Sequence, residues 1–342
     1  MRRPALACIL LAILSLTAAA CGDDDDTAGS QGERLHVVAT TSILGDFVQQ
    51  VGGDRVVVTT VLKPNVDAHD YEPSPADIEA LRTADVIVRN GVGLEAWFDD
   101  TIDASGTSAT IVDTSDGVPI RDGEDDHAED DDHAEDDDHA EADHAEDDHA
   151  EDETDHHHGD GHDHGEGDPH IWLDPTNAVI MVGNITDALV ANDPDGADQY
   201  EANRTAYVEQ LEALDAEIAA EVAGLGNKKL VTNHDAFGYY ADRYGFEIVG
   251  SVIPSFDSSA ELSAKDVDEL VRAIRAEGVT AVFSEVSLPG DSARTIADEA
   301  GVTVVTGDDA LYGDSLGPSD SDAATYVDMM RHNTRTIVSN LE

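Results

Sequence analysis

The stretch 122–168 holds ten histidines, no Lys or Arg, and 25 of the chain's 75 acidic residues. Five of the histidines recur in near-repeats of the form DDHAED and the others follow closely. They are His127, His133, His139, His144, His149, His156, His157, His158, His162 and His164. Imidazole and carboxylate groups bind divalent metals, and a short His-rich tract indicates metal capture. Because the tract is densely charged and nearly lacks large apolar residues, we expect a disordered loop that binds metal weakly. The alternative is an acidic spacer.

A second group of residues that could bind a metal lies where buried strands are expected to end. These candidates are His69, His170, His234 and Asp314, with Glu285 as a supporting or cleft-lining residue. His170 stands in Asp168-Pro169-His170-Ile171-Trp172, where the His-rich tract gives way to apolar neighbours. Ligand groups in open α/β sheets gather beyond the carboxyl ends of the strands, so these side chains could converge on one cation.

Simpler interpretations exist for each candidate. A loop histidine is commonly hydrogen-bonded to backbone and binds no metal. Three other acids near Asp314 could serve in its place, namely Asp308, Asp309 and Asp320. We expect His36, in a strand, and His332, in a C-terminal helix, to be structural, and Trp97 and Trp172 to be packing residues.

The elements that must position these residues alternate between strands and helices. Short segments rich in Val and Ile predict strands covered on both faces. They are 35–40, 56–62, 85–89, 230–232, 247–253, 279–284 and 302–306. Ser74-Pro75-Ala76-Asp77 carries the signals of a helix start, and 265–276 and 291–300 are amphipathic. The fold class is therefore α/β with mainly parallel sheets.

One helix is longer than the rest. Between Asp198 and Leu225, apolar residues recur at steps of three, four and seven, which predicts a helix of roughly 40 Å. We expect it to connect an N-terminal α/β lobe, 34–197, to a C-terminal α/β lobe, 226–342.

The N-terminus indicates export. A basic start precedes an apolar run from Ala5 to Ala20, too short to span a membrane and typical of a signal peptide. Small residues directly before Cys21 resemble the lipobox of bacterial lipoproteins, in which the cysteine is lipidated, although Ala18 stands where Leu is more usual. Residues 1–21 are then a signal peptide with lipobox and 22–33 a flexible tether. Secretion with cleavage near Ala20 is the alternative.

The net charge of −57 excludes some partners. Such a surface repels nucleic acid and anionic headgroups and attracts cations. It is also compatible with a saline habitat. Cys8 leaves with the signal peptide, so Cys21 is the only cysteine of the mature chain and no intramolecular disulfide forms.

Six ordered motifs carry a resemblance to a known family. They are NVDAHDYEPSPADI, NGVGLEAWFDD, DPHIWLDP, NHDAFGYYADRYGFEIVG, YGDSLG and TYVDMMRHNTRTIV. From about Leu35 to the C-terminus the chain resembles the zinc- and manganese-binding solute receptors of ABC transporters, the ZnuA/TroA-like family. The resemblance implies two α/β lobes joined by a long rigid helix, one metal in the cleft between them, and His69, His170, His234 and Asp314 as its ligands. Ala68 departs from the proline that commonly precedes the first histidine.

This ligand set favours Zn²⁺, because three imidazoles and one carboxylate satisfy a tetrahedral ion whereas Mn²⁺ prefers more oxygen. In manganese members of the family the third ligand is Glu. We therefore expect a monomeric zinc receptor, lipid-anchored outside the cytoplasmic membrane, that delivers Zn²⁺ to an ABC permease and is not an enzyme. The alternatives are a manganese receptor, a zinc buffer or chaperone without a transporter, and a secreted zinc hydrolase using Glu285 as base.

Overall fold

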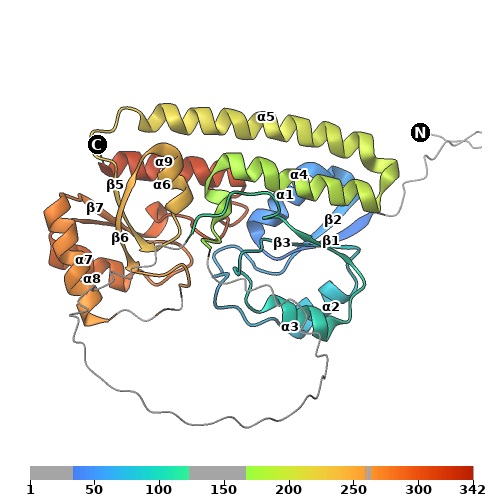
Figure 1. Cartoon of the computed structure of the whole chain (residues 1–342), viewed down its shortest axis with the longest axis horizontal. Coiled ribbons are helices and arrows are strands. Elements are labelled where there is room, and N and C mark those ends of the chain that lie inside the picture. Colours follow the sequence, from blue (N-terminus) through green and yellow to red (C-terminus); the bar gives the residue numbers. More distant parts are fainter. Residues whose placement is uncertain (1–33, 123–166, 259, 261–262, 342) are drawn as a thin grey trace, which may run out of the picture. The chain divides into compact units, whose positions relative to one another are not determined.

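The computed structural model describes residues 34–122, 167–258, 260 and 263–341, and Arg34–Glu342 form one compact unit. Its N-terminal lobe is built on a parallel sheet ordered β2-β1-β3-β4 (Figure 1). The strands are β1 (Leu35–Ala39), β2 (Val56–Thr60), β3 (Val86–Arg89) and β4 (Thr110–Asp113). Val37 pairs with Val58 of β2 and with Val86 of β3, so β1 lies inside the sheet.

The C-terminal lobe contains two parallel strand pairs. They are β5 (Lys229–His234) with β6 (Glu247–Ile253), and β7 (Ala281–Phe283) with β8 (Thr303–Val305). β5 lies against β7, so the four strands follow the spatial order β6-β5-β7-β8. A further bridge between Glu285 and Leu311 extends the pairing beyond the end of β7. The carboxyl ends of β5 and β7 are therefore neighbours, and this places His234 beside Glu285.

Helices cover both faces of the N-terminal sheet. Those of this lobe are α1 (Ser42–Gly52), α2 (Pro75–Arg82), α3 (Phe98–Ser105) and α4 (Pro175–Asn192). Alternation along β1 assigns the faces, because Val37 belongs to the cluster formed with α1 and α4, whereas Val38 belongs to the cluster with Leu81 of α2 and Phe98 of α3. The C-terminal lobe carries α6 (Gly238–Tyr244), α7 (Ala264–Glu277), α8 (Asp291–Ala300) and α9 (Tyr326–Leu341).

Local chemistry explains where helices begin. Ser74 caps α2 and Asp77 returns the bond to the Ser74 backbone, a capping box with Pro75 at the first helical position. Ser263 and Asp266 repeat the arrangement at α7. Each box satisfies backbone N–H groups that the first turn of a helix leaves unpaired.

The long helix α5 (Ala197–Val222) contacts α1 and α4 of the first lobe and α6 and α9 of the second (Figure 1). It has 26 residues and is thus about 39 Å long. Its buried stripe, which includes Tyr207, Leu211 and Leu214, belongs to a continuous apolar core that also contains residues of α1, α4 and α9. The helix is therefore packed along its length, and the two lobes share a core.

The expected fold class is confirmed: α/β, two lobes, parallel sheets and a long connecting helix. The seven expected strands are present with ends shifted by one or two residues, and β6 and α8 match at both ends. Strand β4 was not expected, because Thr110–Asp113 is only four residues long and two of them are exposed. Helix α5 ends at Val222, three residues before the expected end. The domain limits themselves stay a prediction.

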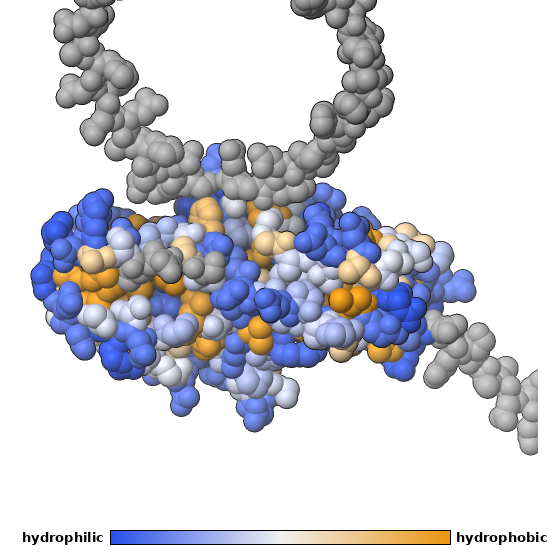
Figure 2. Space-filling view, turned by 90° about the horizontal axis from the view of Figure 1, so that it is seen from below, coloured by the Kyte–Doolittle hydropathy of each residue, from blue (hydrophilic) through white to orange (hydrophobic). Residues whose placement is uncertain are grey.

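The face opposite α5 is largely hydrophilic, with hydrophobic residues in separated patches (Figure 2). Large apolar side chains with more than a third of their surface exposed are, in the described part of the chain, Ile111 and Ile120. Within those same residues, no helix has the length and apolar character that crossing a membrane requires.

Candidate metal centre

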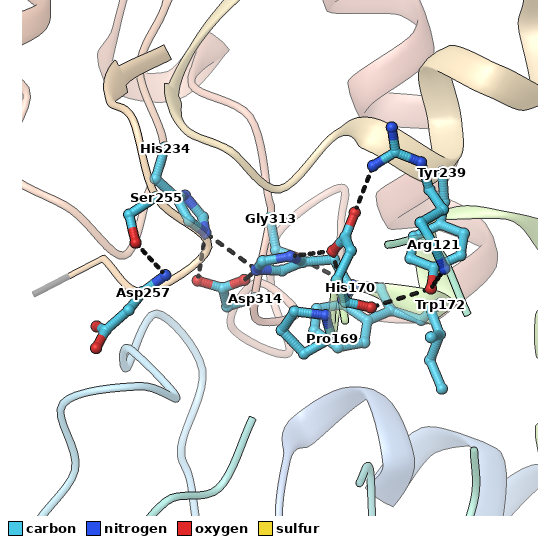
Figure 3. Close-up of polar contacts among 12 residues, drawn as sticks. Arg121, Pro169, His170, Trp172, His234, Tyr239, Ser255, Asp257, Gly313 and Asp314 are labelled. Carbon is cyan, nitrogen blue, oxygen red and sulfur yellow. Dashed lines mark hydrogen bonds and ion pairs between the residues drawn. The ribbon is translucent and has the colours of Figure 1, made fainter. Parts of the chain in front are cut away.

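Four side chains from separate parts of the sequence converge between the lobes. His69, His170, His234 and Asp314 each direct one ligand atom into a group whose members lie within 4.8 Å of one another. The Nε2 atom of His170 is 3.3 Å from Nε2 of His69 and 3.2 Å from Nε2 of His234. The Asp314 oxygens lie 3.4 Å from His170 Nε2 and 3.5 Å from His234 Nε2 (Figure 3). These are the four residues that the sequence singled out.

His69 lies in the loop between β2 and α2 and is the least buried member of the group. Its backbone N–H donates to Asp67 Oδ1 at 2.9 Å. The other oxygen of Asp67 accepts from the Ser258 hydroxyl at 2.5 Å. Asp67 therefore connects the His69 loop of the first lobe to a loop of the second.

His170 is fully buried just before the short 3₁₀ turn Ile171–Leu173. Asp168 Oδ1 accepts from its backbone N–H at 3.0 Å and faces its ring Nδ1 at 2.8 Å. With Nδ1 held as a donor, Nε2 keeps its lone pair and points at the other three ligands. A carboxylate behind a histidine commonly fixes the tautomer that binds metal.

His234 is the last residue of β5 and is also fully buried. Glu285 follows β7 on the neighbouring strand and places Oε1 2.9 Å from His234 Nδ1 and 3.0 Å from its backbone N. The expectation that Glu285 supports the site without joining the ligands agrees with this geometry.

Asp314 lies in the loop between β8 and α9 and is 2% exposed. The indole N–H of Trp172 donates to the carbonyl of Gly313 at 2.9 Å and so holds this loop against the turn after His170. Among the described residues neither carboxylate oxygen has a hydrogen bond of normal geometry, and the imidazoles of His170 and His234 are the nearest polar groups. A buried carboxylate left in that condition is costly unless a cation is nearby.

The electrostatics separate the roles of the histidines. Burial lowers the pKa of His69 to about 4, and the other two imidazoles act in the same direction against the charge of Asp314. For His234 burial also works to lower the pKa, but the charges of Glu285 and Asp314 outweigh it and raise the pKa above its usual value. Burial opposes ionisation of Asp314, yet the three imidazoles, His234 foremost, hold the pKa of this carboxyl below its usual range.

A cavity of about 260 Å³ lies beside the group and has His69 in its wall. His69 and Pro169 line it from the first lobe and Phe256 and Asp257 from the second. The turn 92–94 forms another wall, and Val92 there has a φ of 53°, a backbone conformation that β-branched residues rarely adopt. The opening is thus a cleft between lobes, next to the most accessible histidine.

The remaining candidates lie elsewhere or outside the described residues. His36 is exposed on β1, and buried His332 contacts the carbonyl of Ala310. The alternative acids Asp308, Asp309 and Asp320 are exposed and do not join the group. Trp172 is a packing residue, as expected, with its indole also bonded. Cys21 and the ten histidines of the tract lie outside the described residues.

Two supporting carboxylates were missed from the sequence. Asp168 and Asp67 each lie two residues before a ligand candidate, in Asp168-Pro169-His170 and Asp67-Ala68-His69. That shared spacing was the available signal, since an Asp side chain readily bonds the backbone N–H two residues on.

The comparisons with known proteins agree with this architecture. Residues 37–340 match the family model described as zinc-uptake complex component A, periplasmic. The manganese-binding lipoprotein MntA of Halalkalibacterium halodurans is 31% identical over 97% of both chains, and the high-affinity zinc uptake system protein ZnuA of Bacillus subtilis is 31% identical over 97% of this chain and 96% of its own. The solved structure of the periplasmic zinc-binding protein TroA from Treponema pallidum superposes with a TM-score of 0.72 at 26% identity, covering 90% of this chain and 99% of that one.

Fold and relatives define the class as metal-binding substrate receptors of ABC transporters. The chain belongs to the family of the zinc-uptake complex component A. The relatives' names include both zinc and manganese, so membership leaves the metal open.

Proposed function

We propose that this protein is an extracytoplasmic receptor that captures one Zn²⁺ through His69, His170, His234 and Asp314 and delivers it to an ABC permease. The observation that carries the proposal is the set of distances between the facing ligand atoms, 3.2–3.5 Å. Four ligands about 2.0–2.1 Å from a tetrahedral zinc ion lie roughly 3.3–3.4 Å from one another. Four of the six edges of such a tetrahedron are therefore matched, and the two remaining distances, from His69 to His234 and to Asp314, lie within 4.8 Å.

The chemistry of the donors supports zinc over manganese. Three imidazole nitrogens and one carboxylate oxygen are a common ligand set for zinc, a metal of borderline softness. Manganese prefers sites with more oxygen ligands. In addition, Asp168 and Glu285 face the Nδ1 atoms of His170 and His234, which leaves both Nε2 atoms to the ion. The manganese-binding relative at 31% identity keeps a manganese receptor as the alternative.

The same ligand set supports a receptor over an enzyme. Catalytic zinc sites keep a position open for water, while four protein ligands close the tetrahedron. Glu285, the residue that a hydrolase would need as base, uses Oε1 to hold His234. The family members named in the comparisons are binding and uptake proteins.

Location and delivery complete the proposal. Lipidation of Cys21 would tether the mature chain outside the cytoplasmic membrane, in keeping with the lipoprotein relative. A monomer suffices, because a single chain supplies all four ligands. The cleft beside His69 is the route by which metal reaches the centre and leaves it for the permease.

The test is metal titration of the full mature chain after chelator treatment, in competition with an indicator of known affinity. We expect one tight zinc per chain, bound more tightly than manganese. His170→Ala should abolish the tight site, while His36→Ala, which removes an exposed histidine outside the group, should leave it intact. A tight site that survives His170→Ala, or no tight site in the wild type, would refute the assignment. If the site binds manganese more tightly than zinc, the proposed role as a receptor stands and the assigned metal changes to manganese.

A further inference from the structure

Arg121 lies where the described residues of the N-terminal lobe are interrupted, since they end at Asp122 and resume at Gly167. Its carbonyl accepts from the backbone N–H of Asp168 at 2.9 Å, and Asp122 bridges Gly167 in antiparallel fashion. Tyr239 of α6 joins the same place, since its hydroxyl accepts from Arg121 N at 2.9 Å and donates to Asp168 O at 3.0 Å. The described residues that flank 123–166 are thus held together beside the metal centre.

The guanidinium of Arg121 contacts a carboxylate of each lobe. Nη1 donates to Asp168 Oδ2 at 2.9 Å and Nε donates to Asp242 Oδ2 of α6 at 2.6 Å. The same guanidinium lies 5.7 Å from the centre of the Tyr239 ring, within cation–π range. Its side chain is 24% exposed, whereas that of Asp168 is fully buried.

Asp168 connects this cation to His170. One oxygen accepts from Arg121, and the other receives the backbone N–H of His170 and faces its Nδ1. Among the described residues, Arg121 is the one Lys or Arg that pairs with Asp168. A fully buried carboxylate requires such a partner, because desolvation of an unpaired charge is costly.

Gly238 provides an independent sign that the position of the guanidinium matters. A Cβ atom at Gly238, the first residue of α6, would overlap the guanidinium of Arg121 and lie 2.8 Å from Asp168 Oδ2. No left-handed backbone conformation accounts for a glycine there. Only a residue without a side chain admits the guanidinium between α6 and Asp168.

We propose that Arg121 is a positioning residue for the metal centre: it fixes Asp168, which in turn fixes His170 so that Nε2 faces the ion. Because the guanidinium also binds α6, this support depends on the second lobe being in place. Glu285, which supports His234, has no such cation and keeps Oε2 unpaired within the described residues. The inference rests on the proposed metal centre.

Two substitutions reach the same interaction from opposite sides. Arg121→Gln removes the charge, and Gly238→Ala leaves Arg121 in the sequence but displaces its guanidinium. Each should weaken tight zinc binding by about 10-fold, the lower end of the loss seen when outer partners of metal ligands are removed. The double variant should be no weaker than the worse single variant, because both act through one contact. Arg121→Lys should weaken zinc binding less, because lysine keeps the positive charge although it lacks the paired N–H groups of the guanidinium.

Co²⁺ bound in place of zinc gives a spectroscopic measurement that would not change if Arg121 only stabilised the fold. The visible absorption of Co²⁺ at the tight site should change in Arg121→Gln and Gly238→Ala and return towards wild type in Arg121→Lys. Arg331→Gln, which neutralises an arginine paired with Glu217 away from the centre, and Gly224→Ala, whose Cβ meets no atom within 4 Å, are the matched controls. Both should bind zinc and Co²⁺ as the wild type does.

The outcomes separate this inference from the proposed function. If wild type shows a tight site that His170→Ala abolishes, while Arg121→Gln and Gly238→Ala keep wild-type affinity and Co²⁺ spectrum, the receptor stands and the role of Arg121 is refuted. A lower melting temperature of the metal-free variants with unchanged affinity refutes that role in the same way. If His170→Ala leaves the tight site unchanged, the proposed centre itself fails.

Discussion

Glu285 holds His234 twice with a single oxygen: Oε1 lies 2.9 Å from the ring Nδ1 and 3.0 Å from the backbone nitrogen. The contact crosses from the end of β7 to the end of β5, and both residues are buried. It orients the imidazole so that Nε2 faces His170 and Asp314. Any change of ligand at position 234 is therefore also a change in what Glu285 faces.

Metal preference should follow the donor at position 234. His234→Glu exchanges a borderline nitrogen ligand for a hard oxygen ligand. The affinity for zinc should therefore fall by about 10- to 100-fold, while the affinity for manganese should fall less or rise. Glu285 would then face a second carboxylate, so His234→Glu is best combined with Glu285→Gln. Competitive titration of both metals, with Glu285→Gln alone as control, measures the shift. An unchanged ratio of zinc to manganese affinity would mean that His234 is not a ligand.

The His-rich segment should be dispensable for the tight site. Arg121 O bonds Asp168 N and Asp122 bridges Gly167, so residues 123–166 can be replaced by a two-residue Gly-containing hairpin turn without separating these ends. We expect this deletion to leave one tight zinc per chain and to remove several weak ones, as equilibrium dialysis would show. Loss of the tight zinc would indicate that the segment supplies a ligand.

Membrane attachment should depend on Cys21. The apolar run of the expected signal peptide ends directly before this residue, and in the described part of the chain no helix can span a membrane. Cys21→Ala should release the protein into the soluble fraction, because no acyl chain can then be added. Cell fractionation with immunoblotting measures this, and Ser30→Ala in the tether is a matched control. Equal membrane retention of the Cys21→Ala protein would exclude a lipid anchor at this residue.

Glu95 should make stability fall as the pH rises above the ordinary glutamate range. Burial raises the pKa of Glu95, against hydrogen bonds from the Thr40 hydroxyl and the backbone of Asn90 and Gly91. The folded state then binds a proton that the unfolded state releases. This contribution is complete below the unfolded pKa and is lost as the pH rises through the folded pKa.

Denaturant unfolding of metal-free wild type and Glu95→Gln from about pH 4.5 to 8 checks this. The free energy of unfolding of wild type should decline relative to that of the variant as the pH rises. Glu217→Gln is the control, because the hydrogen bond from Arg331 lowers the pKa of Glu217 and places its titration below this window. Parallel curves for wild type and Glu95→Gln would show that Glu95 stays ionised throughout.

Much of the architecture is readable from local sequence. The capping box at Ser74, the apolar stripe of the long helix and the strand at 247–253 depend on residues within a few positions of each other, and these elements occur where expected. Two segments differ from the expectation: the long helix ends at Val222, before its expected end, and the short strand β4 forms where none was expected. Solvent exposure and neighbouring strands decide whether such marginal segments form.

The ligand candidates were also readable, because the chemistry of His and Asp at strand ends, together with the family motifs, singles them out. How the ligands are held was decided by tertiary structure. Tyr239 and Arg121 are 118 positions apart, and Glu285 and His234 are 51 apart. No local pattern connects such pairs. Their hydrogen bonds exist only because β7 lies beside β5 and because α6, beginning at a glycine, packs closely enough to admit the guanidinium of Arg121.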